Sequence, residues 1–126
     1  MSGPRITVIR GKKHVNQEKG PQLPLQLSHQ VLQTGEAAVE IAGELDLDTA
    51  DEAFRYVQRI INRHRGPMVV SLAEVSFCDA RGLRALVRMA NCAEQADCPF
   101  RVISPSPRLT RLMRMAGLDR KFLAAG

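Results

Sequence analysis

The residues best placed to do chemistry stand where a predicted helix follows a predicted strand. Asp79 lies between the apolar run at 68–72 and a long segment in which apolar residues recur at helical spacing. There its carboxylate can accept hydrogen bonds from the free N–H groups of the first helical turn, and its charge suits the positive helix end. A short exposed loop at a helix N-terminus is also a natural place to bind or receive a phosphate. We therefore expect the stretch 75–86 to carry the functional surface.

A basic stripe begins beside this loop. Arg81, Arg84 and Arg88 recur at helical spacing along the segment that follows Asp79. Most charge runs of this kind are simply the solvated face of a helix. Arginine, however, pairs well with carboxylates through its two-pronged guanidinium group. The stripe is therefore either a solvated face or a contact surface for an acidic partner.

No arrangement of side chains in the sequence indicates catalysis. The three histidines, His14, His29 and His64, are not spaced with a nucleophile, and there is no Gly-rich phosphate loop or zinc-protease motif. An acidic group between the predicted hairpin and the first helix lacks the pattern of a calcium loop, and turn or helix-cap roles explain it better. It comprises Glu44, Asp46, Asp48, Asp51 and Glu52. We predict a protein that is not an enzyme and has no cofactor or metal ion.

The three cysteines have two interpretations. Cys78, Cys92 and Cys98 are odd in number and lack CxxC spacing, so neither a disulfide framework nor a zinc site is expected. Cys92 and Cys98 are read as small apolar residues. Cys78 adjoins the Asp79 loop, so a redox-sensitive thiol is the alternative there, although nothing in the sequence lowers its pKa.

The composition of the chain indicates one globular domain preceded by a basic segment. The 126 residues are 44% hydrophobic and 25% charged, as in ordinary globular proteins. Of the net charge of +5, residues 1–20 contribute +4, and aromatics are only 4%, so nucleic-acid binding is not expected. Residues 1–24, rich in Gly and Pro, are predicted to be a flexible basic N-terminal extension with at most a brief isolated strand at 6–9. A basic arm that contacts an acidic partner is the alternative.

The sequence also bears on where the protein resides. No apolar run approaches the ~20 residues of a membrane-spanning helix. The N-terminus has no signal-peptide apolar core. We therefore expect a cytoplasmic protein without membrane insertion.

Alternating and apolar runs predict the strands of a sheet. The segments 25–33 and 37–45 alternate around a Gly-containing turn and predict a β-hairpin, with Ala37, Val39 and Ile41 on one face. Gly43 within the second strand indicates a bulge or a close backbone approach. The runs 68–72, apolar and fit for burial on both faces, and 100–103 predict two further strands.

Helices are predicted between and after these strands. The first begins at a cap formed by Asp48 or Thr49, runs to about Arg65 and ends at Gly66, which is expected to take the left-handed turn. Others are expected at 80–96 and at 108–115. The buried residues predicted for the first and last helices are Ala53, Phe54, Val57, Ile60, Ile61, Leu109, Leu112, Met113 and Ala116. The pattern predicts an α/β layer fold, with a mixed β-sheet of about four to five strands and helices mainly on one face.

Several stretches occur together in a recognisable order. They are Gly43-Glu-Leu-Asp-Leu-Asp-Thr49, Val69-Val-Ser-Leu72, Phe77-Cys-Asp-Ala-Arg-Gly-Leu83, Ser104-Pro-Ser-Pro107 and Leu112–Leu118. Over roughly residues 25–124 this order and spacing resemble the STAS domain of bacterial anti-sigma-factor antagonists, so 25–126 is identified as a STAS domain. In that family the residue after the loop aspartate is usually a serine or threonine that a partner kinase phosphorylates. Here it is Ala80, which has no hydroxyl.

The resemblance implies a role in transcription regulation through protein–protein interaction. It implies that this chain binds an anti-sigma factor of the histidine-kinase-like ATPase type, and that phosphorylation at Ala80 cannot switch it off. Ser76 is a weak substitute phosphoacceptor. The alternative is a STAS scaffold that serves as a subunit of a sensory complex or a lipid-transport ATPase.

The resemblance also names the surface and the assembly to expect. The partner-binding residues expected are Asp79, Ala80, Arg81, Gly82, Arg84 and Arg88, with Asp46 and Asp48 on the neighbouring loop. A monomer or weak homodimer is expected.

Overall fold

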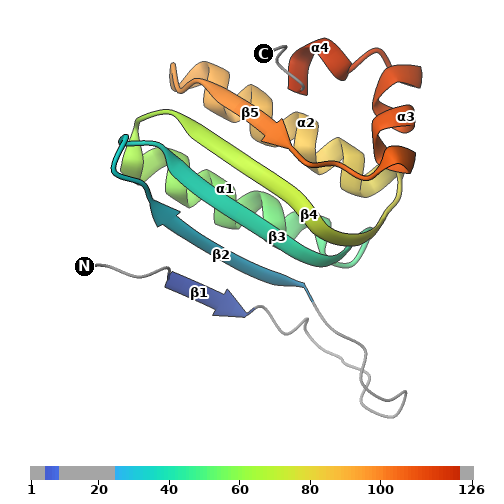
Figure 1. Ribbon diagram of the computed structural model, residues 1–126, viewed down its shortest axis with the longest axis horizontal. Helices are drawn as coiled ribbons and strands as arrows, with labels where there is room; N and C mark the ends of the chain where they lie inside the picture. Colours follow the sequence, from blue (N-terminus) through green and yellow to red (C-terminus); the bar gives the residue numbers. More distant parts are fainter. Residues whose placement is uncertain (1–4, 9–24, 123–126) are drawn as a thin grey trace.

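A five-stranded sheet forms the centre of the computed structural model, which describes residues 5–8 and 25–122 (Figure 1). Its strands are β1 (Arg5–Val8), β2 (Gln26–Val31), β3 (Ala37–Leu45), β4 (Met68–Cys78) and β5 (Phe100–Ile103), in that spatial order. The first three strands pair antiparallel, whereas β4 is parallel to β3 and β5 is parallel to β4. The sheet is therefore mixed, as predicted.

Two long helices connect the parallel strands. α1 (Ala50–His64) links β3 to β4, and α2 (Ala80–Gln95) links β4 to β5. They lie side by side behind the sheet and cover one of its faces (Figure 1). After β5, α3 (Pro107–Met115) and the short α4 (Asp119–Phe122) complete the described chain, and α4 packs near β5. The predicted placement of helices mainly on one face is confirmed.

The core lies between the sheet and the α1–α2 layer. Ala37, Val39 and Ile41 of β3 point into it, as their alternation predicts, and each is at most 1% exposed. Every residue predicted to be buried on α1 is buried. On α3, Leu109 and Met113 are buried and Leu112 is partly buried. Ala116, also predicted to be buried, is exposed because α3 ends at Met115.

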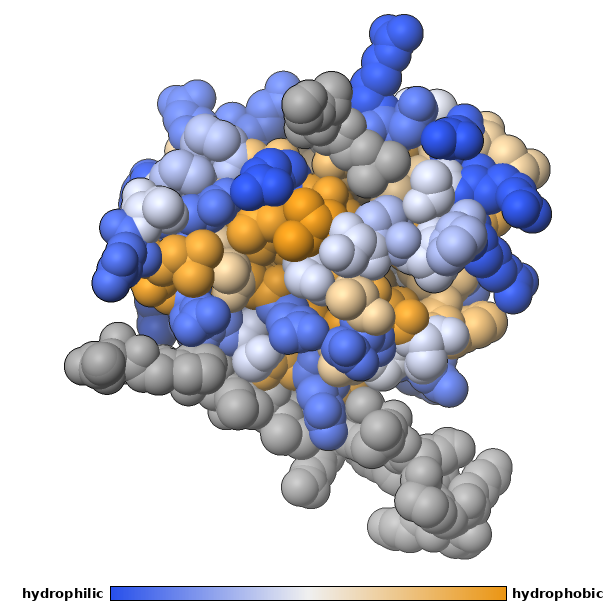
Figure 2. Space-filling model, in the orientation of Figure 1, coloured by the Kyte–Doolittle hydropathy of each residue, from blue (hydrophilic) through white to orange (hydrophobic). Residues whose placement is uncertain are grey.

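The opposite face of the sheet is seen in Figure 2, where polar and apolar side chains are interspersed. Val69 lies on this face yet is 5% exposed. Register places it beside Arg101 of β5, whose guanidinium reaches Glu36 at 3.1 Å, before the start of β3. This ion pair crosses β4 and so shields Val69. The prediction that the start of β4 is buried on both faces is confirmed.

Three local predictions need correction. The segment at 6–9 was expected to contribute at most an isolated strand, but β1 pairs with β2 and extends the sheet. The left-handed residue at the end of α1 is Arg65, with φ of 58°, rather than Gly66. β4 continues to Cys78 instead of stopping near 72, because β3 stays paired with it, across two register shifts, as far as Leu45 opposite Cys78.

Gly43 marks the irregularity predicted for β3. The β3–β4 register shifts on both sides of this residue, whose φ is 105°. That backbone conformation favours glycine, since a side chain there is strained. Both shifts place the extra residue in β4, so β4 is the bulged strand and Gly43 lies opposite the bulge.

Candidate partner-binding site

The β3–α1 loop and the start of α2 meet at one edge of the sheet. β3 and β4 are parallel, so their carboxyl ends lie together, with Leu45 opposite Cys78. The Asp79 N–H donates to the Leu45 carbonyl at 3.3 Å. Residues 46–49 are thereby held against the first turn of α2.

Asp79 is the N-cap of α2, as its position in the sequence predicts. Its Oδ1 accepts hydrogen bonds from the N–H groups of Arg81 at 2.9 Å and Gly82 at 3.0 Å. The backbone of Asp79 is extended, as a cap residue requires. Ala80, the first residue of the helix, is exposed and presents only a methyl group. The first turn of α2 is therefore capped by Asp79 but carries no hydroxyl at the position after the aspartate.

Gly82 is buried against the end of β3. A Cβ at this position would overlap the Leu45 carbonyl oxygen and lie 2.9 Å from the Cys78 sulfur. Only glycine lets the first turn of α2 approach β3 this closely. This packing explains the residue type, so we leave Gly82 out of the surface that we propose below.

The basic stripe divides into two parts. Arg88 donates to Asp51 at 3.2 Å, and its guanidinium lies 4.0 Å from the centre of the Phe54 ring, so it ties α2 to α1. Arg81 and Arg84 are exposed and form no ion pair within residues 5–8 and 25–122. Two of the three arginines are thus available to a partner.

The loop before α1 is held by its own side chains. Asp46 Oδ1 accepts from the Asp48 N–H at 3.0 Å, and the Thr49 hydroxyl donates to the Glu44 carbonyl at 2.7 Å. Thr49 is the N-cap position of α1, but its hydroxyl makes no cap hydrogen bond there. The predicted helix start is right and the predicted capping bond is wrong, because the hydroxyl bonds back to β3. Asp46 is half-buried and Asp48 is exposed.

Sequence reasoning missed one feature of this edge, the exposed Leu47. Its side chain is 60% exposed at the tip of the loop. With Ala50, Asp51 and Ala85, it lines a groove of about 320 Å³ whose rim includes all three arginines of the stripe. A leucine placed between two aspartates in a predicted turn was the signal available, since apolar residues are unusual at turn tips. The groove offers an apolar surface beside two free positive charges.

The surroundings of Cys78 disfavour the thiolate form of its side chain. Burial, together with the nearby charges of Asp79 and Asp46, raises the pKa of Cys78 to about 11. The thiolate is the form that reacts with oxidants and electrophiles, and it is scarce at neutral pH with such a pKa. The structure argues against the redox interpretation. Cys98 is buried and Cys92 partly so, as expected for small apolar residues.

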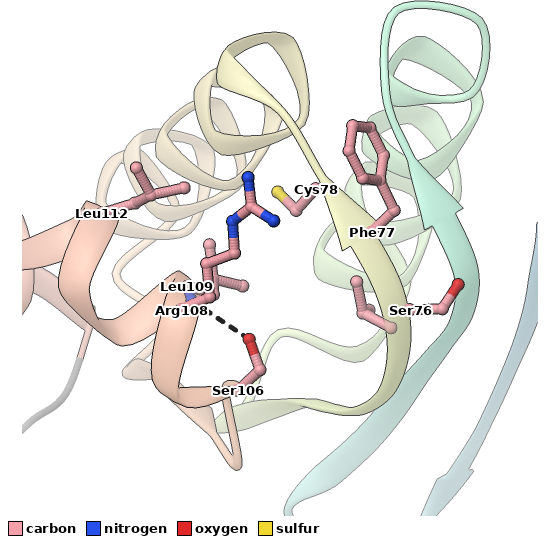
Figure 3. Close-up of a pocket in the computed structure, with 8 residues that line it drawn as sticks. Ser76, Phe77, Cys78, Ser106, Arg108, Leu109 and Leu112 are labelled. Atoms are coloured by element: carbon pink, nitrogen blue, oxygen red, sulfur yellow. Dashed lines mark hydrogen bonds between the residues drawn. The ribbon is translucent and has the colours of Figure 1, made fainter.

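A second, smaller cavity opens between the end of β4 and α3 (Figure 3). It measures about 80 Å³, and the Cys78 sulfur and the Arg108 guanidinium point into it. Ser106 caps α3 by accepting from the Leu109 N–H at 3.0 Å. Ser76, the weak substitute phosphoacceptor, is exposed, and its hydroxyl points away from the cavity.

The described residues contain neither a cluster of metal-binding side chains nor a helix that could span a membrane. Those residues hold no cluster of three or more His, Cys, Asp or Glu that could bind a metal ion. His29 is hydrogen-bonded to the Tyr56 hydroxyl at 2.6 Å, and His64 to the Gly35 carbonyl at 2.8 Å, both away from the Asp79 edge. His14 lies outside the described residues. Across the same ranges, each helix is too short or too polar to span a membrane.

Comparison with known families identifies the domain. Residues 28–124, about three quarters of the chain, match the family described as "Mlab, STAS domain". The chain belongs to the STAS-domain family. The resemblance drawn from the sequence motifs is thereby confirmed. No curated protein matches this STAS domain.

Solved structures share its fold. An anti-sigma factor antagonist from Mycobacterium paratuberculosis is 22% identical, with a TM-score of 0.68 over 79% of this chain and 83% of that one. A Thermotoga maritima protein described as a putative anti-sigma factor antagonist is 17% identical, with a TM-score of 0.67 over 75% and 80%. A sulfate transporter family protein from Wolinella succinogenes is 22% identical, with a TM-score of 0.61 over 72% and 74%. At these identities the likeness establishes the STAS fold alone.

Proposed function

We propose that this STAS domain is a protein-interaction module of the anti-sigma-factor-antagonist type, which binds a kinase-type anti-sigma factor. The observation that carries the proposal is the edge formed by Asp79, Ala80 and the first turn of α2. There the turn capped by Asp79 presents Arg81 and Arg84 without ion-pair partners in the described chain. The antagonist fold of two structural neighbours supports this class of partner.

The contact surface that we propose joins charge and apolar area. Arg81 and Arg84 supply the charge, Leu47 supplies the apolar contact, and Ala80 allows close approach because it has only a methyl group. Interfaces commonly combine an apolar centre with a polar rim. Asp48 and Asp79 lie at the border, where they would repel an acidic surface that docks out of register. The partner surface should therefore be acidic around an apolar residue.

The surface is proposed to act without a phosphorylation switch at the usual position. A phosphate at the start of α2 would add nearly two negative charges beside the proposed contacts and expel an acidic partner. Ala80 cannot carry one. Control would then come from other inputs, such as the amount of protein present. We propose no catalytic activity for the domain, and a cytoplasmic location follows from the proposed partner.

A second candidate function has its own support. The matching family is named for Mlab, and one structural neighbour is a sulfate transporter family protein. These names favour a STAS scaffold that serves as a subunit of a larger assembly, such as a lipid-transport ATPase or a sensory complex. In that case the absent hydroxyl marks a scaffold that no longer needs a phosphorylation switch.

The first experiment separates the two candidates. Tagged protein is used as bait in lysate from the source organism, and bound proteins are identified by mass spectrometry. Recovery of a kinase-like anti-sigma factor supports the antagonist role. Recovery of only transporter or sensory-complex subunits would reject that role and favour the scaffold.

The charge at the proposed surface gives a sharper test. Arg81→Glu should weaken binding of the recovered partner roughly tenfold or more, because it places like charges against each other. Arg111→Glu is the matched control, since Arg111 is equally an exposed helical arginine but lies on α3. Calorimetry measures both affinities, and circular dichroism checks that both variants fold. Equal affinity for the Arg81 variant and the wild type would remove Arg81 from the interface.

Restoring the hydroxyl tests the kinase-type partner directly. Ala80→Ser places an exposed serine at the first position of α2. Incubated with the recovered partner and ATP, this variant should gain one phosphate by intact mass, whereas the wild type should gain none at this loop. The phosphorylated variant should lose affinity through the added charge. An Ala80→Ser protein that stays unmodified would contradict a kinase-type partner.

A further inference from the structure

A second groove lies on the helix side of the sheet, away from the Asp79 edge. It runs between β2 and the C-terminal half of α1 and measures about 380 Å³. Its lining residues are His29, Val31, Tyr56, Arg59, Ile60, Arg63 and His64. None of them belongs to the proposed α2 surface.

The floor of this groove exposes apolar surface that residues 5–8 and 25–122 leave uncovered. Val31, the last residue of β2, is 57% exposed although its register with Ala37 points it toward the helix layer. Ile60 of α1 lines the same groove and is 8% exposed. Exposed single valines are common, but this one lines a groove of about 380 Å³, which is large enough to receive an apolar side chain. The groove can therefore receive an apolar side chain.

Positive charge surrounds that floor. Arg59 and Arg63 are one helical turn apart and exposed, and neither forms an ion pair within the described residues. None of the described residues that line the groove is acidic. A basic residue in the last turn of a helix stabilises the helix dipole, which accounts for Arg63. Arg59 lies too far from the helix end for that explanation.

We propose that this groove is a second docking site, for an acidic segment of another protein. An apolar side chain of that segment would lie on Val31 and Ile60, and flanking carboxylates would pair with Arg59 and Arg63. Arginine suits this role because its guanidinium binds carboxylates through two parallel hydrogen bonds. This docking site is separate from the partner-binding surface proposed at the Asp79 edge.

Charge argues against the other occupants. Residues 9–24 of this chain are themselves basic, with Arg10, Lys12, Lys13 and Lys19 against Glu18. Two copies joined symmetrically through the groove would set its arginines against one another. Single-stranded nucleic acid needs exposed aromatic rings for stacking, and Tyr56 is only 4% exposed. An acidic protein segment remains as the occupant with matching charge.

A peptide titration followed by NMR tests the proposal. The probe is the synthetic peptide acetyl-Glu-Asp-Leu-Leu-Glu-Asp-amide, added to the isotope-labelled full chain. Amide shifts should change mainly at residues 29–31 and 56–64. Arg59→Ser with Arg63→Ser should weaken binding roughly tenfold, the scale expected for two exposed ion pairs. Val31→Ser should weaken it through loss of apolar contact.

The control variant removes the same charge from another helix, and the control peptide reverses the charge of the probe. Arg111→Ser with Arg114→Ser removes the same charge from α3 and should leave peptide affinity unchanged. The peptide acetyl-Lys-Arg-Leu-Leu-Arg-Lys-amide should not bind. No shift changes with the acidic peptide up to about 1 mM would overturn the proposal. Equal losses of peptide affinity in both double variants would also overturn it. So would binding to phosphatidylglycerol vesicles that is stronger than binding to the acidic peptide and depends on Arg59 and Arg63. Self-association of the chain through this groove would overturn it as well.

Discussion

Replacing Gly82 with alanine should destabilise the domain, although alanine is the better helix former. At an open helical position this change stabilises by up to about 1 kcal/mol. At position 82 the added methyl group overlaps the Leu45 carbonyl oxygen and contacts the Cys78 sulfur. Overpacking of this kind costs about 1–3 kcal/mol, and occasionally more. Because the obstacle is backbone and cannot rotate away, we expect the higher costs to apply and a net loss of about 2 kcal/mol.

Urea unfolding followed by circular dichroism measures this loss. With a slope of about 1–3 kcal/mol per molar urea, the unfolding midpoint should fall by about 1 M. Ala80→Gly is the control in the same helical turn, where the exposed position should lose less than about 1 kcal/mol through helix propensity alone. A midpoint for Gly82→Ala at or above that of the wild type would refute the close approach of α2 to β3.

Three further predictions concern the same edge. Asp79→Ala should lower the free energy of unfolding by about 1 kcal/mol because two backbone N–H groups lose their acceptor, whereas Asp79→Asn should retain most of the stability. Equal unfolding midpoints for the wild type and Asp79→Ala would show that the cap contributes nothing. Cys78 should resist iodoacetamide in the folded protein until the pH approaches its pKa of about 11, and react readily in urea, as peptide mass spectrometry can show. Because folding raises this pKa from its ordinary value near 9, stability should decrease as the pH rises from about 9 to about 11, and should decrease less in Cys78→Ala. Rapid alkylation of the folded protein at neutral pH would contradict the burial of this thiol.

The sequence alone determined the features that depend on near neighbours in the chain. The alternation of Ala37, Val39 and Ile41 placed one face of β3 in the core, because successive strand residues point to opposite faces. Helical spacing identified the buried face of α1, because residues three or four apart in a helix lie on the same face. Asp79 was recognisable as a cap because its hydrogen bonds reach only two and three residues along the chain. The family motifs then identified the domain and drew attention to Ala80.

Only the tertiary structure decided how distant segments use these residues. Gly82 is explained by the carbonyl of Leu45, and Arg88 is held by Asp51 and the Phe54 ring. Such contacts join strands and helices far apart in the chain, so no local pattern records them. The same reasoning applies to β1, whose four residues become a strand through pairing with β2. It also applies to the groove over Val31, which exists because α1 leaves that residue uncovered at the end of β2.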